Sequence, residues 1–243
     1  MLGRFRIYYL PSIILPSSSY QCRLDLLFKS VYLLKTASFY QIKTVLDSLL
    51  SLSTSNITME RHSPFIITGG PGSGKTTLLD ALAARDYKTF EEVPRKLIAE
   101  QSKLENGILP WNQLAAFAEL CFKDMMNQKQ TASTSDQLSF LDRAIPDICA
   151  YLTFGNEAVP PRVTEQAKVG YQALVFTCEP NTSTYVQDDV RPYPFEEALE
   201  IHRQLIEQYQ SLGYRCISVP FLKLEQRVEF VLAESYAHLG QTG

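Results

Sequence analysis

From Pro64 onward, short apolar runs alternate with longer segments in which apolar residues recur every three to four positions. The short runs are typical of buried strands, and the longer segments are typical of amphipathic helices. The predicted strands are 65–68, 87–90, 138–141, 172–177 and 214–219. The predicted helices are 75–84, 92–101, 111–128, 146–154, 194–211 and 224–235. This alternation indicates a three-layer α/β fold with a mainly parallel, five-stranded sheet.

The predicted helix 111–128 shows the clearest helical periodicity. Its apolar residues at three-to-four spacing are Leu114, Phe117, Ala118, Cys121, Phe122 and Met125. They lie on one face, which we expect to pack on the sheet, and the pair Met125–Met126 is expected in the core. Residues 129–136 contain a run of Thr and Ser, and we predict a solvent-exposed loop there.

Residues 1–58 differ from the rest of the chain in composition. They are rich in Ser, contain no Glu, and carry six Lys or Arg against two Asp, so their net charge is +4 while residues 59–243 carry −7. Their apolar run Ile7–Leu15 is far shorter than the roughly 20 residues that span a bilayer. A transit peptide, a signal-like segment and a poorly ordered extension before Met59 remain open. We therefore divide the chain into an extension, 1–58, poorly ordered or loosely docked, and a main domain, 59–243.

The composition argues against several other classes of function. The five cysteines are scattered and form no C-x-x-C pair, which argues against a disulfide framework or zinc site and favours a reducing, cytoplasmic compartment. The three histidines are far apart in sequence, so we expect no metal site built from protein side chains alone. The acidic main domain argues against nucleic acid as the principal partner.

The strongest chemical signal is a glycine-rich segment between the first predicted strand and helix. Its residues are Gly69, Gly70, Pro71, Gly72, Ser73, Gly74, Lys75 and Thr76, followed by Thr77. They satisfy the phosphate-binding pattern G-x-x-x-x-G-K-[ST], in which backbone N–H groups surround the phosphates of a nucleotide. We expect Lys75 to reach the β- and γ-phosphates and the Thr76 hydroxyl to ligate Mg²⁺.

A second Mg²⁺ ligand is expected at the end of another buried strand. The run Leu138–Leu141 is apolar and ends in Asp142, sixty-seven residues after Lys75. Carboxylate oxygens are ligands that Mg²⁺ prefers. Asp142 is therefore our candidate for the metal carboxylate, and a helix-capping aspartate is the alternative.

Three segments together resemble a known family. They are Phe65–Thr77 with the glycine-rich loop, Phe90–Ile98 with the sequence FEEVPRKLI, and Phe140–Asp147 with the sequence FLDRAIPD. The main domain is similar to the NadR-like, AAA-type predicted ATPases, related to the nicotinamide riboside kinase domain of NadR and to the TRPL translocation defect proteins. Ala144 and Val190 stand where relatives usually have Gly. The resemblance implies a P-loop kinase fold and leaves the substrate open.

The resemblance also implies roles for four residues beyond the loop. Glu92 lies where related kinases place a carboxylate that accepts a proton from the substrate hydroxyl, and Arg95 shares its helical face. Arg143 looks like the arginine that faces phosphate or substrate, and Arg191 like a lid arginine that approaches the transferring phosphoryl group. The alternatives are a surface ion pair between Glu92 and Arg95, a salt bridge from Arg143 to Asp147, and a solvated Arg191.

Two functions follow from these residues. The first is a phosphotransferase that uses ATP and Mg²⁺ and acts on a small, nucleoside-like acceptor; GTP is not excluded, because the loop binds phosphates and not the base. The second is a nucleotide-dependent switch or ATPase-coupled binding module without kinase activity. A mechanical motor ranks third, because no second module of the kind that ring-forming motors carry follows the nucleotide domain.

Overall fold

A five-stranded parallel sheet forms the centre of the main domain in the computed structural model, which describes residues 63–182, 185 and 194–241. The strands are β1 (Phe65–Thr68), β2 (Lys88–Phe90), β3 (Ser139–Asp142), β4 (Leu174–Thr177) and β5 (Arg215–Ser218). Their order is β2-β3-β1-β4-β5, and every neighbouring pair is parallel. The predicted α/β class and five-stranded sheet are confirmed. The extension 1–58 and Arg191 lie outside the described residues.

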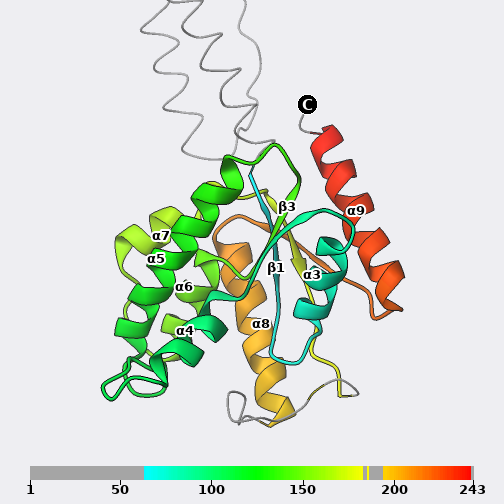
Figure 1. The fold of residues 1–243 in the computed structure, drawn as a ribbon. Helices are drawn as coiled ribbons and strands as arrows, with labels where there is room; N and C mark the ends of the chain where they lie inside the picture. Colours follow the sequence, from blue (N-terminus) through cyan, green and yellow to red (C-terminus); the bar gives the residue numbers. More distant parts are fainter. Residues whose placement is uncertain (1–62, 183–184, 186–193, 242–243) are drawn as a thin grey trace, which may run out of the picture. The chain divides into compact units, whose positions relative to one another are not determined.

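Helices cover both faces of the sheet (Figure 1). One face carries α3 (Lys75–Ala83) and α9 (Leu224–Gln241), which pack against each other. The opposite face carries α4 (Val93–Gln101), α5 (Leu114–Ser133), α6 (Ile145–Phe154), α7 (Pro161–Ala167) and α8 (Phe195–Ser211). This is the three-layer arrangement that the alternating pattern predicts.

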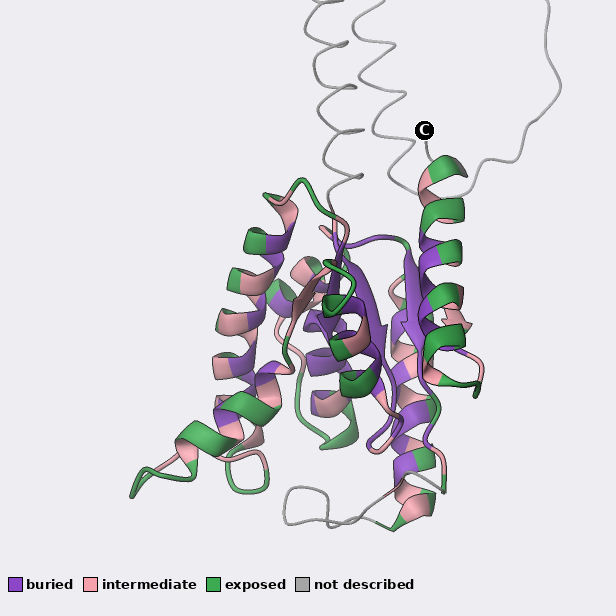
Figure 2. Ribbon diagram, turned by 45° about the vertical axis from the view of Figure 1, so that its right-hand side comes forward, coloured by how far each residue is buried: buried purple, intermediate pink, exposed green. Residues whose placement is uncertain are grey.

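The three central strands, β1, β3 and β4, are buried along their whole length because each of their faces meets a helical layer (Figure 2). Phe65 and Ile67 of β1 point into the core under α3 and α9, whereas Ile66 between them points into the core under the other helices. All three side chains are fully buried. A sequence of buried residues with no polar alternation is therefore what these central positions require.

Two parts of the sequence prediction were wrong on the face of the sheet that lies opposite α3 and α9. α5 does not end near Gln128 but runs to Ser133, so most of the predicted loop 129–136 is helical. Lys129 and Ala132 within that stretch are buried. α7 has no counterpart among the predicted helices; it begins at Pro161, at the first helical position where proline is tolerated. No helix within the described residues is long and apolar enough to cross a membrane.

Lys129 explains why the polar stretch remains helical. Its ammonium donates to the backbone carbonyl of Gln166 (3.0 Å), the side-chain amide oxygen of Gln166 (2.9 Å) and the carbonyl of Val169 (3.3 Å). The ammonium also lies 5.1 Å from the centre of the Tyr171 ring. Burial lowers the pKa of Lys129 to about 8. The last turns of α5 are thus tied to the end of α7 through one side chain.

We predict that Lys129→Met destabilises the domain by about 1–3 kcal/mol, because the carbonyls of Gln166 and Val169 lose their charged donor while the aliphatic stem is retained. Urea unfolding followed by circular dichroism measures the change. Lys123→Met is the matched control, since Lys123 is exposed on the same helix. Equal stabilities of the two variants would contradict the prediction.

Candidate functional site

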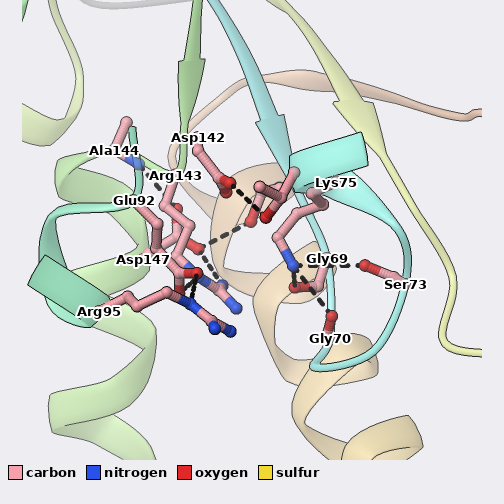
Figure 3. A network of polar contacts seen from close by, with 12 residues as sticks. Gly69, Gly70, Ser73, Lys75, Glu92, Arg95, Asp142, Arg143, Ala144 and Asp147 are labelled. Carbon is pink, nitrogen blue, oxygen red and sulfur yellow. Dashed lines mark hydrogen bonds and ion pairs between the residues drawn. The ribbon is translucent and has the colours of Figure 1, made fainter. Parts of the chain in front are cut away.

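The glycine-rich loop joins the carboxyl end of β1 to the first turn of α3, at the edge of the sheet where β3 and β4 flank β1 (Figure 3). Gly69 has φ +138°, and a Cβ there would lie 2.0 Å from the carbonyl oxygen of Cys178. Gly74, with φ +73°, caps α3 in the left-handed region. A side chain at position 69 would force the loop away from the end of β4, and one at position 74 would strain the left-handed backbone beside Arg227. The glycines therefore permit the close approach that a phosphate-binding loop needs.

Lys75 lies buried in the loop. Its ammonium donates to the carbonyl oxygens of Gly69 and Gly70, each at 3.1 Å, and to the Ser73 hydroxyl at 3.3 Å (Figure 3). Burial and the nearby positive charge of Arg143 lower its pKa. All three acceptors are neutral, so the ammonium has hydrogen bonds here but no directly bonded anion. An anionic ligand at the loop would supply that charge.

Thr76 and Asp142 meet beside the loop, as expected for a pair that shares a metal. The Thr76 hydroxyl donates to Asp142 Oδ2 at 3.5 Å. Asp142 is almost fully buried, and its Oδ1 has no hydrogen-bond partner among the described residues. Burial raises the pKa of its carboxyl to about 6. An orphaned, buried carboxylate oxygen next to a hydroxyl fits the ligand set of Mg²⁺.

Thr76 and Asp142 fit a metal ion that phosphate groups also bind. They do not fit an ion that is bound by protein side chains alone. No group of three or more His, Cys, Asp or Glu side chains that could hold an ion occurs within the part of the chain that the structure describes. Mg²⁺ in nucleotide sites usually keeps one or two protein ligands, with phosphates and waters supplying the rest. Thr76 and Asp142 match that small set.

Glu92 and Arg143 form the centre of a second charged group opposite the loop. Glu92 precedes the first turn of α4, and Arg143 follows β3 with φ +66°, unusual for a residue with a side chain. Arg143 Nε donates to Glu92 Oε1 at 3.0 Å, and Arg95 Nε donates to Glu92 Oε2 at 3.4 Å. The Arg143 guanidinium also lies over the Tyr151 ring, 5.6 Å from its centre. The fold thus brings Glu92, Arg95 and Arg143, three residues that the sequence analysis singled out, into one hydrogen-bonded group.

The pKa of Glu92 reflects these neighbours. Burial by itself raises the pKa of its carboxyl, but the positive charges of Arg143, Lys75 and Arg95 outweigh burial and lower it to about 2. Glu92 is therefore ionised at neutral pH. A carboxylate so strongly paired is a weak base, and its main effect on a bound hydroxyl is to accept a hydrogen bond.

Asp147 makes more hydrogen bonds than the sequence analysis expected. The sequence analysis considered it only as a salt-bridge partner of Arg143. Its carboxylate accepts hydrogen bonds from Thr68 Oγ1 (2.7 Å), Arg143 Nη1 (2.9 Å), the Ala144 backbone N–H (3.1 Å) and the Tyr209 hydroxyl. The local signal is its place in the first turn of α6, where an acid bonds the preceding N-cap. Its links to β1 and α8 cannot be read from local sequence.

Arg227 is a second residue that sequence reasoning missed. It extends from α9 to the loop, where Nη2 donates to the Ser73 carbonyl and to Cys178 Sγ, both at 3.4 Å. It is 9% exposed, and its Nε has no partner within the described residues. No carboxylate pairs with it in that part of the chain. A buried cation without a counterion lies beside a loop that favours anions.

A cavity of about 660 Å³ connects these groups. At one end it is lined by the loop, Arg227 and residues that precede α9; it then passes Glu92, Arg95 and Arg143 and continues between α4, α5 and α6. The predicted loop residues from Pro71 to Thr77, together with Glu92, Arg95 and Arg143, therefore line one continuous cavity. Gly69, Gly70 and Asp142 do not line it, and Arg191 lies outside the described residues.

Comparisons with known proteins agree with the fold of the main domain. The model of a family described as AAA domain matches residues 64–227. The structure of NadR protein in complex with NR aligns with a TM-score of 0.54 and 18% identity, over 79% of this chain and 59% of that chain. The chain thus spans about three fifths of the length of that protein. Deoxyadenosine kinase from M. mycoides with products bound aligns with a TM-score of 0.50 and 13% identity, over 71% of this chain and 98% of that chain. No curated protein matches the sequence.

We predict that Asp142→Asn raises the free energy of unfolding of the nucleotide-free protein by on the order of 1–2 kcal/mol at pH 8. The folded-state pKa of Asp142, about 6, lies above its ordinary value of 3.8, so the charged carboxylate costs stability above pH 6. This difference should disappear as the pH falls through 6 toward 3.8, because Asp142 itself becomes protonated.

Asp147→Asn is the contrasting variant. Its carboxylate is fully hydrogen-bonded, so the amide should lower the free energy of unfolding by about 3 kcal/mol at either pH. Urea denaturation at pH 8 and pH 4.5 separates the two behaviours. A less stable Asp142→Asn protein at pH 8 would show that the orphaned oxygen is paired in solution.

Proposed function

Because the chain belongs to the AAA domain family, whose model matches residues 64–227, we propose that it is a small-molecule kinase that transfers the terminal phosphoryl group of a nucleoside triphosphate to an acceptor hydroxyl. The fold is that of P-loop kinases. The observation that carries the proposal is that one continuous cavity extends from the phosphate-binding loop past Glu92 into a second compartment. A switch needs only the first compartment, whereas a kinase needs both.

The nucleotide binds with its phosphates at the loop. Backbone N–H groups of the loop and of the first turn of α3 point at one place and favour an anion there. Lys75 exchanges its loop carbonyls for phosphate oxygens. ATP is the expected nucleotide and GTP is not excluded, since these contacts do not distinguish the bases.

Thr76 and Asp142 hold Mg²⁺ in this proposal. The orphaned Oδ1 of Asp142 and its contact with the Thr76 hydroxyl support the assignment. Bound Mg²⁺ neutralises charge that develops on the phosphate oxygens. Asp142 becomes fully ionised in the metal's presence, which removes the cost of burying its charge alone.

Arg227 is a further phosphate ligand in this proposal. Among the described residues, its guanidinium donates only to the Ser73 carbonyl oxygen and the Cys178 sulfur, so a phosphate at the loop would supply the counterion. It also connects α9 to the nucleotide. Binding would therefore alter the environment of two helices, α3 and α9, that pack on each other.

Glu92, Arg95 and Arg143 orient the acceptor. The carboxylate of Glu92 accepts a hydrogen bond from the acceptor hydroxyl, which aligns its oxygen with the terminal phosphorus. A strong base is not needed, because little proton transfer precedes bond cleavage in a loose transition state. Arg191 remains our candidate lid arginine. A small-molecule acceptor is consistent with the NR and nucleotide products named for the aligned structures.

A nucleotide-dependent switch is the second candidate. The bonds of Lys75 to Gly69 and Gly70 favour it, because the loop must rearrange these contacts when phosphate enters. Arg227 offers a route from the nucleotide to α9. Such a protein would bind and hydrolyse nucleotide without passing phosphate to an acceptor.

We predict that Lys75→Ala raises the dissociation constant of Mg²⁺–ATP by at least about 100-fold and that Arg227→Met raises it by about tenfold, because each removes a charge-assisted contact to phosphate. Isothermal titration calorimetry with ATP and GTP measures both. Lys223→Met controls for charge, since it removes a cation from an exposed side chain four residues before Arg227. Wild-type affinity in Lys75→Ala would refute nucleotide binding at this loop.

We predict that Glu92→Gln lowers phosphoryl transfer by about 10–100-fold, because a neutral amide oxygen accepts a weaker hydrogen bond from the acceptor hydroxyl than a carboxylate does, while Mg²⁺–ATP affinity changes less than about threefold. Transfer from ATP labelled in its terminal phosphate to a panel of nucleosides and simple alcohols is the measurement. Arg95→Gln, at the outer side of the same group, is the comparison and should lose less. Hydrolysis that is insensitive to Glu92→Gln, with no labelled ester, would favour the switch.

A further inference from the structure

The cavity has a second compartment between α4, α5 and α6, and its lining is more apolar than that of the compartment at the phosphate-binding loop. Its walls are apolar side chains from α4, α5 and α6, among them Ile98, Leu114, Phe117, Met125, Ile148 and Phe154. Phe117 and Met125 are buried, whereas Leu114 is half-buried and Phe154 is 40% exposed. The wall therefore combines core residues with apolar groups that solvent still reaches.

Charged groups lie only toward the loop side of this compartment. Glu92, Arg95 and Arg143 stand where the two compartments meet, and their charges are paired with one another or with Asp147. Deeper in, Cys121 contributes a thiol that burial keeps neutral, since its pKa is raised to about 12. Among the described residues, the lining of this end holds no Asn, Gln, Ser or Thr side chain, and its other polar side-chain groups are the Trp111 indole N–H and the Tyr151 hydroxyl.

We propose that the acceptor is an alcohol with an apolar body, either hydrocarbon or aromatic, rather than a polar nucleoside. This inference rests on the proposed kinase function and narrows its substrate. The hydroxyl end lies at Glu92 and the apolar body lies between α4, α5 and α6. The division of the cavity into a charged end and an apolar end carries the assignment.

Desolvation explains why such a pocket selects against nucleosides. A nucleoside has several ribose hydroxyls and polar base edges, and each one buried against an apolar wall without a partner lowers affinity roughly tenfold. Each methylene group moved from water to the same wall raises affinity about fourfold. A single hydroxyl at the charged end meets acceptors and donors that the compartment does supply.

The proposed transfer balances in atoms and electrons. The acceptor oxygen forms a bond to the terminal phosphorus, and the bond from that phosphorus to the bridging oxygen breaks with its electron pair on the nucleoside diphosphate. The hydroxyl proton stays in its hydrogen bond to Glu92 while the new phosphorus–oxygen bond forms and the old one breaks, and it is then released to water. The products are a phosphate monoester, a nucleoside diphosphate and one proton.

Trp111 provides a reporter for this compartment. It is the only tryptophan in the sequence, it lines the cavity, and it is 58% exposed. Its fluorescence should therefore change when a ligand displaces water from the apolar end. This signal does not require bound nucleotide, so acceptor binding can be measured separately from the loop.

The experiment titrates the full chain with 4-phenyl-1-butanol and, in parallel, with adenosine, while Trp111 fluorescence is recorded. We expect the dissociation constant of 4-phenyl-1-butanol to be at least about tenfold lower than that of adenosine. Leu114→Gln and Phe154→Gln should each weaken binding of the alcohol by about fivefold or more. Leu120→Gln is the matched control, because Leu120 is half-buried on the same helix but does not line the cavity.

The outcomes separate the inference from the function on which it rests. Adenosine binding as tight as the alcohol, or alcohol binding unchanged in both Leu114→Gln and Phe154→Gln, overturns the inference. Because Phe154 is exposed, its substitution tests the pocket even if Leu114→Gln fails to fold. Calorimetry with ATP and GTP runs on the same samples. Alcohol binding by a protein that binds neither nucleotide overturns the proposed kinase function instead.

Discussion

One buried carboxylate, that of Asp147, joins the parts of the molecule that form the site. It accepts hydrogen bonds from Thr68 at the end of β1, Arg143 after β3, and Tyr209 on α8. It also bonds the backbone N–H that begins α6. Because a buried anion that loses a partner is strongly destabilised, these hydrogen bonds favour the observed arrangement of the elements over others. The carboxyl edge of the sheet, where the loop and Arg143 lie, depends on that arrangement.

Two aspartates five residues apart show how the same chemistry serves structure and function differently. Every lone-pair direction that Asp147 needs is met within the protein, whereas Asp142 keeps one oxygen without a partner among the described residues. The unpaired oxygen costs stability in the isolated protein, and under the proposed function it would serve as a ligand of Mg²⁺. Lys75 and Arg227 have the opposite charge to Asp142. Both are buried cations that are not hydrogen-bonded to an anion among the residues described.

The position of the charged groups also determines what the cavity can do. Glu92 and Arg143 separate a compartment lined by the phosphate-binding loop from one lined by α4, α5 and α6. Their ion pair places charge at the boundary and leaves the far compartment apolar. A phosphoryl group and an acceptor hydroxyl could therefore meet only at the boundary, where the pairing of Glu92 keeps it ionised at neutral pH.

The sequence by itself determined the features that depend on near neighbours. The run Phe65–Thr68, the glycine-rich loop and Asp142 at the end of β3 were predictable because strand burial and loop curvature are properties of a few consecutive residues. Tertiary structure alone decided the end of α5, where Lys129 bonds carbonyls 37 and 40 residues away. It also decided the places of Asp147 and Arg227, whose partners Tyr209 and Ser73 are distant in sequence. Pairing between buried polar groups that are distant along the chain produces no periodic pattern in the sequence. Both the burial of each group and the identity of its partner depend on how the elements pack.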